Sequence, residues 1–132
     1  MTVRIMLVDD DELIRMGLKM ILESEFDFDI VGEAANGAEA LVMIRGLKPD
    51  VILMDIQMPV MDGIEATRRI KEQNPGDAAP RVLVLTTFGQ NEYVTRAIQA
   101  GASGFLLKRM PADELIASIK DAAQPIISPN NQ

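Results

Sequence analysis

The side chains best suited to chemistry are acidic, hydroxyl and amine groups that directly follow short apolar runs. Three consecutive aspartates, Asp9–Asp11, follow the first run, and Asp55 follows a later one. The hydroxyls of Thr86 and Thr87 and the amine of Lys108 follow two further runs. Carboxylates that gather in one place repel each other, by roughly 4 kcal/mol for a pair about 4 Å apart near a protein surface. Such a set therefore predicts a bound cation, with the Lys108 ammonium beside it.

The residue types that are missing narrow the chemistry further. The 132 residues include no histidine and no cysteine, so the usual general base, thiolate nucleophiles and zinc sites built from those ligands are excluded. Oxygen ligands alone favour Mg²⁺, Mn²⁺ or Ca²⁺. Mg²⁺ uses only one or two carboxylates and leaves positions for water and phosphate. The composition therefore suits a site for phosphoryl transfer.

The elements that would position these residues are short strands alternating with helices. Apolar runs predict strands at Val3–Val8, Ile30–Ala34, Val51–Met54, Val82–Leu85 and Gly104–Leu107. Apolar residues that recur at helical spacing follow each of them. Five such units in a row indicate the α/β class, with a parallel sheet covered by helices on both faces. Ligands of such sheets bind beyond the carboxyl ends of the strands, so the polar residues are expected to meet in one crevice.

Each polar residue also has a purely structural interpretation. Asp11 could cap the helix that follows it, and Asp9 and Asp10 could be solvated loop charges. Asp55 could accept hydrogen bonds from loop amides, and Lys108 could be a surface charge. These interpretations become weak when taken together, because the residues stand at corresponding ends of successive predicted strands.

Composition and charge restrict the class of protein to which the chain can belong. The length and the 48% of hydrophobic residues suit one domain, which we expect over residues 1–124. Pro125 and Pro129 end the helical pattern, so residues 125–132 are expected to be a linker or tail. The formal net charge of −7 argues against nucleic-acid binding by this chain alone. No apolar run is long enough to span a membrane and no signal-peptide pattern precedes the first strand, so we expect a soluble, cytoplasmic protein.

Five stretches of the chain resemble the receiver domains of two-component response regulators, in the order and at the spacing of that family. They are Leu7–Asp11, Asp50–Asp55, Met58–Gly63, Val84–Thr86 and Gly101–Lys108. The resemblance covers almost the whole chain and implies a flavodoxin-like, doubly wound (βα)5 fold with strand order 2-1-3-4-5. Further stretches are most similar to the NarL/FixJ (LuxR-type) branch. They are Val82–Phe88 together with Glu92–Val94, and Lys108–Pro111.

The resemblance also assigns roles at the acidic site. Asp55 would be the phosphoacceptor. Asp9 and Asp10 would hold Mg²⁺, or alternatively Mn²⁺, together with Asp55. Gln57 would offer its backbone carbonyl to the same ion.

A second group of roles concerns the response to phosphorylation. Lys108 would bind the phosphoryl group, and the hydroxyl of Thr86 would be drawn towards it. Phe105 would be the switch aromatic that fills the space left by Thr86. Arg109 departs from the family pattern, because many receivers have a proline after the lysine, often in a cis bond. We therefore expect a trans bond here.

The resemblance implies a signalling protein that assists only its own phosphorylation and dephosphorylation, not an enzyme acting on other substrates. A sensor histidine kinase or a small phosphodonor would supply the phosphoryl group. The usual output of this branch is a helix-turn-helix DNA-binding domain, which these 132 residues do not contain, and phosphorylation would control its exposure or its dimerisation.

Three other functions fit the sequence less well. Aspartyl-phosphate hydrolases of the haloacid dehalogenase type need a second aspartate two residues beyond the nucleophile, where this chain has Gln57. A nucleotide-binding module needs a Gly-rich phosphate loop after the first strand, where Asp9–Asp11 would repel phosphates. A degenerate receiver that serves only as an interaction module would not need the complete set of expected site residues.

Overall fold

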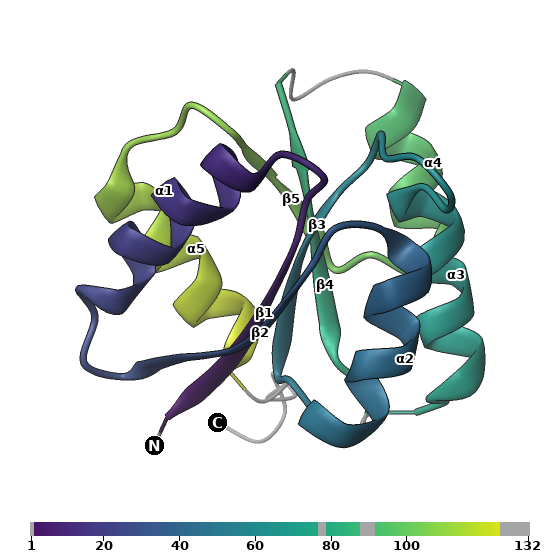
Figure 1. The fold of residues 1–132 in the computed structure, drawn as a ribbon, viewed down its shortest axis with the longest axis horizontal. Helices are drawn as coiled ribbons and strands as arrows, with labels where there is room; N and C mark the ends of the chain where they lie inside the picture. Colours follow the sequence, from purple (N-terminus) through teal and green to yellow (C-terminus); the bar gives the residue numbers. More distant parts are fainter. Residues whose placement is uncertain (1, 77–78, 88–91, 125–132) are drawn as a thin grey trace, which may run out of the picture.

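The computed structural model describes residues 2–76, 79–87 and 92–124. Strands and helices alternate along these segments (Figure 1). The elements are β1 (Val3–Val8), α1 (Glu12–Glu23), β2 (Phe28–Ala34), α2 (Gly37–Leu47), β3 (Val51–Asp55), α3 (Gly63–Gln73), β4 (Arg81–Thr86), α4 (Glu92–Ala100), β5 (Gly104–Leu107) and α5 (Ala112–Ala123). The predicted linker, residues 125–132, lies outside the described residues.

The strands form one parallel sheet in the order β2-β1-β3-β4-β5, as the sequence predicts. The chain moves outwards from β1 to β2 and then returns to place β3 on the other side of β1. The order therefore reverses between β1 and β3, which is where sheets of this class bind ligands. Figure 1 shows α1 and α5 on one face of the sheet and α2, α3 and α4 on the other.

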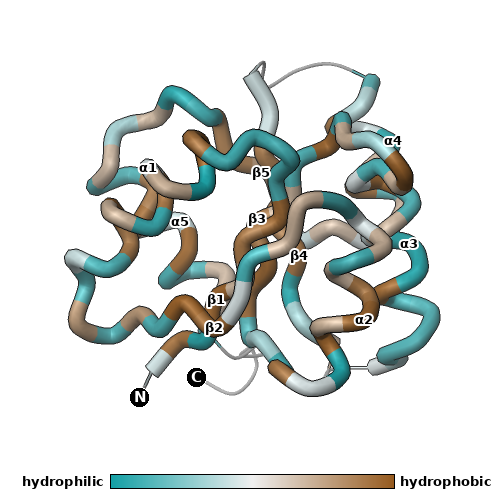
Figure 2. The backbone as a smooth tube through the Cα atoms, in the orientation of Figure 1, coloured by the Kyte–Doolittle hydropathy of each residue, from teal (hydrophilic) through white to brown (hydrophobic). Residues whose placement is uncertain are grey.

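Alternate residues of the central strands fill two separate cores. Met6, Met54 and Val84 belong to the core beneath α2, α3 and α4. Leu7 and Leu53 belong to the core beneath α1 and α5. Strands that are buried on both faces need apolar side chains at every position, which explains the continuous apolar runs in the sequence. Figure 2 shows the same pattern as hydrophobic strands flanked by helices of mixed hydropathy.

The predicted strand boundaries are close to those observed, and two of the differences matter for the site. β1 and β5 begin and end where the sequence predicts, whereas β3 extends to Asp55 and β4 to Thr86. Both residues are thus the last of their strands, held in register by ladder hydrogen bonds. The described residues include no cis peptide bond, in agreement with the trans bond expected at Arg109.

Side chains cap the start of three helices, and one of these caps decides the role of Asp11. Asp11 accepts hydrogen bonds from the N–H groups of Leu13 and Ile14 and caps α1, with Asn36 and Asp62 capping α2 and α3. The capping interpretation of Asp11 is therefore correct. Across the described parts of the chain, every helix is too short or too polar to cross a bilayer.

The loop between β3 and α3 folds tightly against the backbone of Asp55. The Gly63 N–H donates to the Ile56 carbonyl at 2.7 Å, and a Cβ placed on Gly63 would lie 2.0 Å from the Asp55 carbonyl oxygen. Only glycine allows this approach. The loop therefore holds the end of β3 in one position.

The same loop contains a strained turn centred on Val60. The Met61 N–H donates to the Pro59 carbonyl at 2.7 Å, and the φ angle of Val60 is +70°. A hydrogen bond of this type across a positive φ defines a γ-turn that is rare and strained. A β-branched residue is unfavourable there, because its side chain crowds the backbone. We infer that Val60 lowers the stability of the fold.

Replacing Val60 by asparagine should therefore stabilise the protein, because asparagine tolerates a positive φ better than valine does. We expect Val60→Asn to raise the free energy of unfolding by about 1 kcal/mol. Urea unfolding, monitored by circular dichroism, measures this free energy for each variant. Val42→Asn is the matched control, because Val42 is similarly exposed (76%, against 83% for Val60) but lies within helix α2. Equal effects of the two substitutions would contradict the strain at Val60.

Candidate functional site

The carboxyl edge of the sheet brings together the acidic residues that the sequence singles out. Asp9 and Asp10 follow β1, and Asp55 ends the neighbouring strand β3. One carboxylate oxygen from each of the three lies within 4.8 Å of the others. The predicted crevice is thus present, and it lies where the strand order reverses.

The three carboxylates differ in their exposure to solvent. Asp9 is 1% exposed and Asp55 is 6% exposed, whereas Asp10 is exposed. The Asp9 backbone is held from α1, where Arg15 donates to the Asp9 carbonyl oxygen and pairs with Glu33 at 3.2 Å. Two negative charges are therefore kept close together and away from water.

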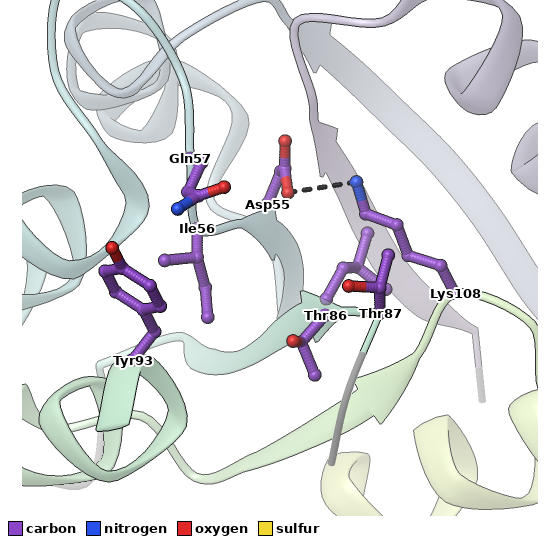
Figure 3. A pocket seen from close by; sticks show the side chains of 8 residues that line it. Asp55, Ile56, Gln57, Thr86, Thr87, Tyr93 and Lys108 are labelled. Carbon is purple, nitrogen blue, oxygen red and sulfur yellow. Dashed lines mark ion pairs between the residues drawn. The ribbon is translucent and has the colours of Figure 1, made fainter. Parts of the chain in front are cut away.

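Lys108 supplies the positive charge that faces this pair. Its Nζ atom lies 3.1 Å from Oδ1 of Asp55 and 3.5 Å from Oδ2 of Asp9 (Figure 3 draws the ion pair with Asp55). The Lys108 N–H donates to the Thr86 carbonyl at 2.8 Å, which ties the lysine to the end of β4. One ammonium group thus bridges two buried carboxylates.

One buried oxygen of Asp9 accepts no hydrogen bond from the part of the chain that the structure describes. Oδ1 accepts from the Asp11 N–H at 2.9 Å, but Oδ2 is buried and accepts no hydrogen bond from the described residues. It lies 3.5 Å from Nζ of Lys108. Buried polar atoms are normally satisfied, so an acceptor left in this state is suited to a cation.

The electrostatics of the cluster are unfavourable to the ionised form of Asp55. Burial raises the pKa of Asp55 from 3.8 to about 6, and the charge of Asp9 acts in the same direction, although Lys108 opposes both. Burial also disfavours the charged form of Lys108, but its hydrogen bond and attraction to Asp55 outweigh this and raise its pKa. A further positive charge would therefore be stabilised between the carboxylates.

The donor set fits a hard divalent cation. The three residues offer only carboxylate oxygens, one of them a buried oxygen that accepts no hydrogen bond from the described residues, and oxygen donors are those that Mg²⁺ and Mn²⁺ prefer. Gln57, two residues beyond Asp55, lines the same cavity as Asp55 (Figure 3).

A cavity of about 320 Å³ adjoins the carboxylates. It is lined by Asp55, Ile56, Gln57, Leu85, Thr86, Thr87, Tyr93 and Lys108 (Figure 3). A phosphoryl group on Asp55 would enter a space that Thr86 and Lys108 already border. The structure thus brings together all the predicted site residues except Phe105, which is exposed on β5 and lies outside the set that lines the cavity.

Three residues that line the cavity, Ile56, Leu85 and Tyr93, are not singled out by the sequence interpretation, and Tyr93 is the one with a polar side chain. It appears there only as part of a stretch shared with one branch of the family. A signal was present, because Tyr93 lies four residues before Ala97, and residues four apart share one face of a helix. Ala97 is fully buried against the sheet, whereas Tyr93 is exposed and stands at the border of the buried face that Val94 and Ala97 form.

Comparison with known proteins agrees with this architecture. The profile of the family described as "Response regulator receiver domain" matches residues 5–120. The transcriptional regulatory protein DegU of Brevibacillus brevis is 43% identical over 122 residues, which are 92% of this chain and 50% of DegU. The chain thus spans about half the length of this curated relative.

Two solved structures are similar over nearly the whole chain. The receiver domain of the putative response regulator NarL from Mycobacterium tuberculosis superposes with a TM-score of 0.84, at 36% identity, covering 92% of this chain and 96% of that one. A LuxR-family two-component response regulator from Aurantimonas sp. SI85-9A1 gives a TM-score of 0.85 at 35% identity, covering 99% and 93%. Fold, sequence and acidic edge agree, and the chain belongs to the response regulator receiver domains, in their NarL/LuxR branch.

Proposed function

We propose that this chain receives a phosphoryl group on Asp55 and passes on the signal by changing shape. The observation that most supports this role is the setting of Asp55. It is a buried carboxylate, its Oδ1 lies 3.1 Å from Lys108 Nζ, and it lines a cavity large enough for a phosphoryl group. Membership of a family of signalling domains supports it independently.

The transfer itself would use Asp55 as the nucleophile. One carboxylate oxygen forms a bond to the phosphorus of the donor, and the bond from phosphorus to the leaving group breaks. Lys108 would bind the phosphoryl oxygens and keep the acceptor oxygen oriented. Catalysis of this kind is mostly positioning and charge neutralisation, so the chain needs no general base.

A divalent cation would complete the site. Asp9, Asp10, Asp55 and the backbone carbonyl of Gln57 are the groups that would hold it. When bound, Mg²⁺ supplies the positive charge that neutralises the phosphoryl oxygens. Mn²⁺ has similar ligand preferences and could substitute.

The switch would begin at Thr86. New phosphoryl oxygens on Asp55 would draw in the Thr86 hydroxyl, because they are strong hydrogen-bond acceptors. Phe105 lies on β5, next to β4, and would move into the space that Thr86 leaves. The change would then reach the surface of α4 and β5.

The whole protein would work as a transcriptional regulator in the cytoplasm. A sensor histidine kinase or a small phosphodonor would phosphorylate the receiver, which would assist only its own phosphorylation and dephosphorylation. DegU is a transcriptional regulatory protein and this chain spans half of its length, which supports an output domain beyond residues 125–132. Resemblance to the NarL/LuxR branch makes that domain a helix-turn-helix, with dimerisation on phosphorylation as one route of control. The charge of −7 leaves DNA binding to that second domain.

Phosphorylation at a single residue tests the proposal. Incubation with Mg²⁺ and acetyl phosphate should add one phosphoryl mass to the wild type and none to Asp55→Asn, measured by intact-protein mass spectrometry. Asp29→Asn, at an exposed position on β2, is the matched control and should be phosphorylated normally. Phosphorylation of Asp55→Asn to full yield would contradict the assignment of Asp55 as the phosphoacceptor.

The metal ligands can be tested by removing one carboxylate at a time. We expect Asp10→Ala to weaken Mg²⁺ binding by about tenfold or more, which corresponds to about 1.4 kcal/mol, and to slow phosphorylation as well. Asp11→Asn is the control, since it removes a charge from the next residue but keeps a side chain that can cap α1. Titration of Mg²⁺ into the metal-free proteins, followed by amide chemical shifts, measures the Mg²⁺ affinity of the two variants. Mass spectrometry at successive times after addition of acetyl phosphate measures how fast each is phosphorylated. Equal losses in the two variants would mean that Asp10 acts only through its charge.

A further inference from the structure

Tyr93 occupies a place in the acceptor cavity that the proposed function does not use. It lies in the first turn of α4, and its side chain lines the cavity together with Asp55 and Lys108. The other described lining residues come from the ends of β3 and β4, the residues just after them, and Lys108 after β5. Tyr93 is thus the one described lining residue that a helix contributes.

Helix geometry explains how Tyr93 reaches the cavity. α4 follows β4, so its N-terminus lies at the carboxyl edge of the sheet, where the site is. Side chains of a helix lean towards its N-terminus, so a residue in the first turn at the border of the buried face extends over that edge. Val94 and Ala97 form the buried face, and Tyr93 lies beside them at its border.

The ring of Tyr93 forms the side of the cavity that faces away from the charges. Figure 3 shows Tyr93 and Gln57 on one side of Asp55 and Lys108 on the other, with Ile56 between the ring and the acceptor. Tyr93 is 39% exposed, so more than half of its surface is covered although it stands at the rim. A rigid, apolar ring in this position excludes water from part of the cavity.

Water is the reagent that ends the phosphorylated state. A water oxygen forms a bond to phosphorus, the bond from phosphorus to the Asp55 oxygen breaks, and its electron pair returns to the carboxylate. Inorganic phosphate leaves, and the proton of the water goes to solvent or to the phosphate. The attacking water must approach in line, from the side of the phosphorus opposite the Asp55 oxygen.

We propose that Tyr93 is a positioning residue that restricts the approach of this water and so lengthens the lifetime of the phosphoryl group on Asp55. This inference rests on the proposed function. The ring, not the hydroxyl, performs the role, because the obstruction is steric and apolar. Tyr93→Phe therefore keeps the effect, whereas Tyr93→Ala removes it.

Rates of hydrolysis in four proteins test the inference. The wild type, Tyr93→Ala, Tyr93→Phe and Ile98→Ala are phosphorylated with acetyl phosphate and Mg²⁺, the donor is removed, and loss of the phosphoryl mass is followed with time. Ile98→Ala is the matched control, since Ile98 lies on the same helix with similar exposure (43%) but does not line the cavity. We expect Tyr93→Ala to lose the group about threefold faster or more, and the other two variants to stay within about twofold of the wild type.

The possible results separate this inference from the function on which it rests. A wild type that accepts no phosphoryl group contradicts the proposed function and this inference together. A wild type that is phosphorylated normally, with Tyr93→Ala hydrolysing at the rate of Ile98→Ala, contradicts the inference alone. Tyr93→Phe hydrolysing as fast as Tyr93→Ala also overturns it, because the hydroxyl would then be responsible.

Intrinsic fluorescence gives a second readout that needs no substitution at Tyr93. The chain has one tyrosine and no tryptophan, so tyrosine emission reports on Tyr93 alone. Addition of beryllofluoride with Mg²⁺ should change that emission in the wild type and leave it unchanged in Asp55→Asn. Unchanged emission in a wild type whose amide spectrum shows beryllofluoride bound at Asp55 would place Tyr93 away from the phosphoryl group and overturn the inference.

Discussion

Two buried carboxylates share a single ammonium group at the edge of the sheet, and the behaviour of the site follows from this shortage of positive charge. Lys108 lies within 3.5 Å of both Asp9 and Asp55, and the exposed Asp10 adds a third negative charge. Removing carboxylates from water is costly unless they are paired. The site therefore favours a proton or a cation beside the carboxylates.

The fold keeps the carboxylates in this arrangement because it fixes their backbones from several directions. β1 and β3 are neighbours in the centre of the sheet and are buried on both faces. Arg15 holds the carbonyl of Asp9 from α1, and Gly63 brings the start of α3 against the carbonyl of Asp55. The strained turn at Val60 lies in the short connection that makes this second contact. The rigid core thus opposes the separation that repulsion alone would produce.

The sequence predicts the fold and most of the site because both follow from position along the strands. Asp55 and Lys108 stand at strand ends, and parallel strands bring their ends to one edge whatever the details of packing. The role of Asp11 could not be decided in this way, since aspartate after a strand suits a helix cap and a ligand equally well. Tyr93 depends on how α4 is rotated against the sheet, and the turn at Val60 depends on closure of a loop between two packed elements. Helical spacing places Tyr93 one turn before Ala97 but does not show that its ring reaches the acceptor cavity, and no periodicity signals the turn at Val60.

The measurement that tests the central claim most directly is the stability of metal-free wild type and Asp55→Asn as a function of pH. The pKa of Asp55 is 3.8 before folding and about 6 in the fold, so the folded state binds more protons between these values. Stability of the wild type should then fall relative to Asp55→Asn as the pH rises from about 4 to 7, by about 3 kcal/mol in total. Urea unfolding at a series of pH values gives the difference, with Asp29→Asn as the control for an exposed aspartate. A wild type that loses stability relative to Asp55→Asn in this window supports an Asp55 carboxylate whose ionised form destabilises the fold. Curves that stay parallel from pH 4 to 7 would show that Lys108 already balances the charge of Asp55 and would contradict the account.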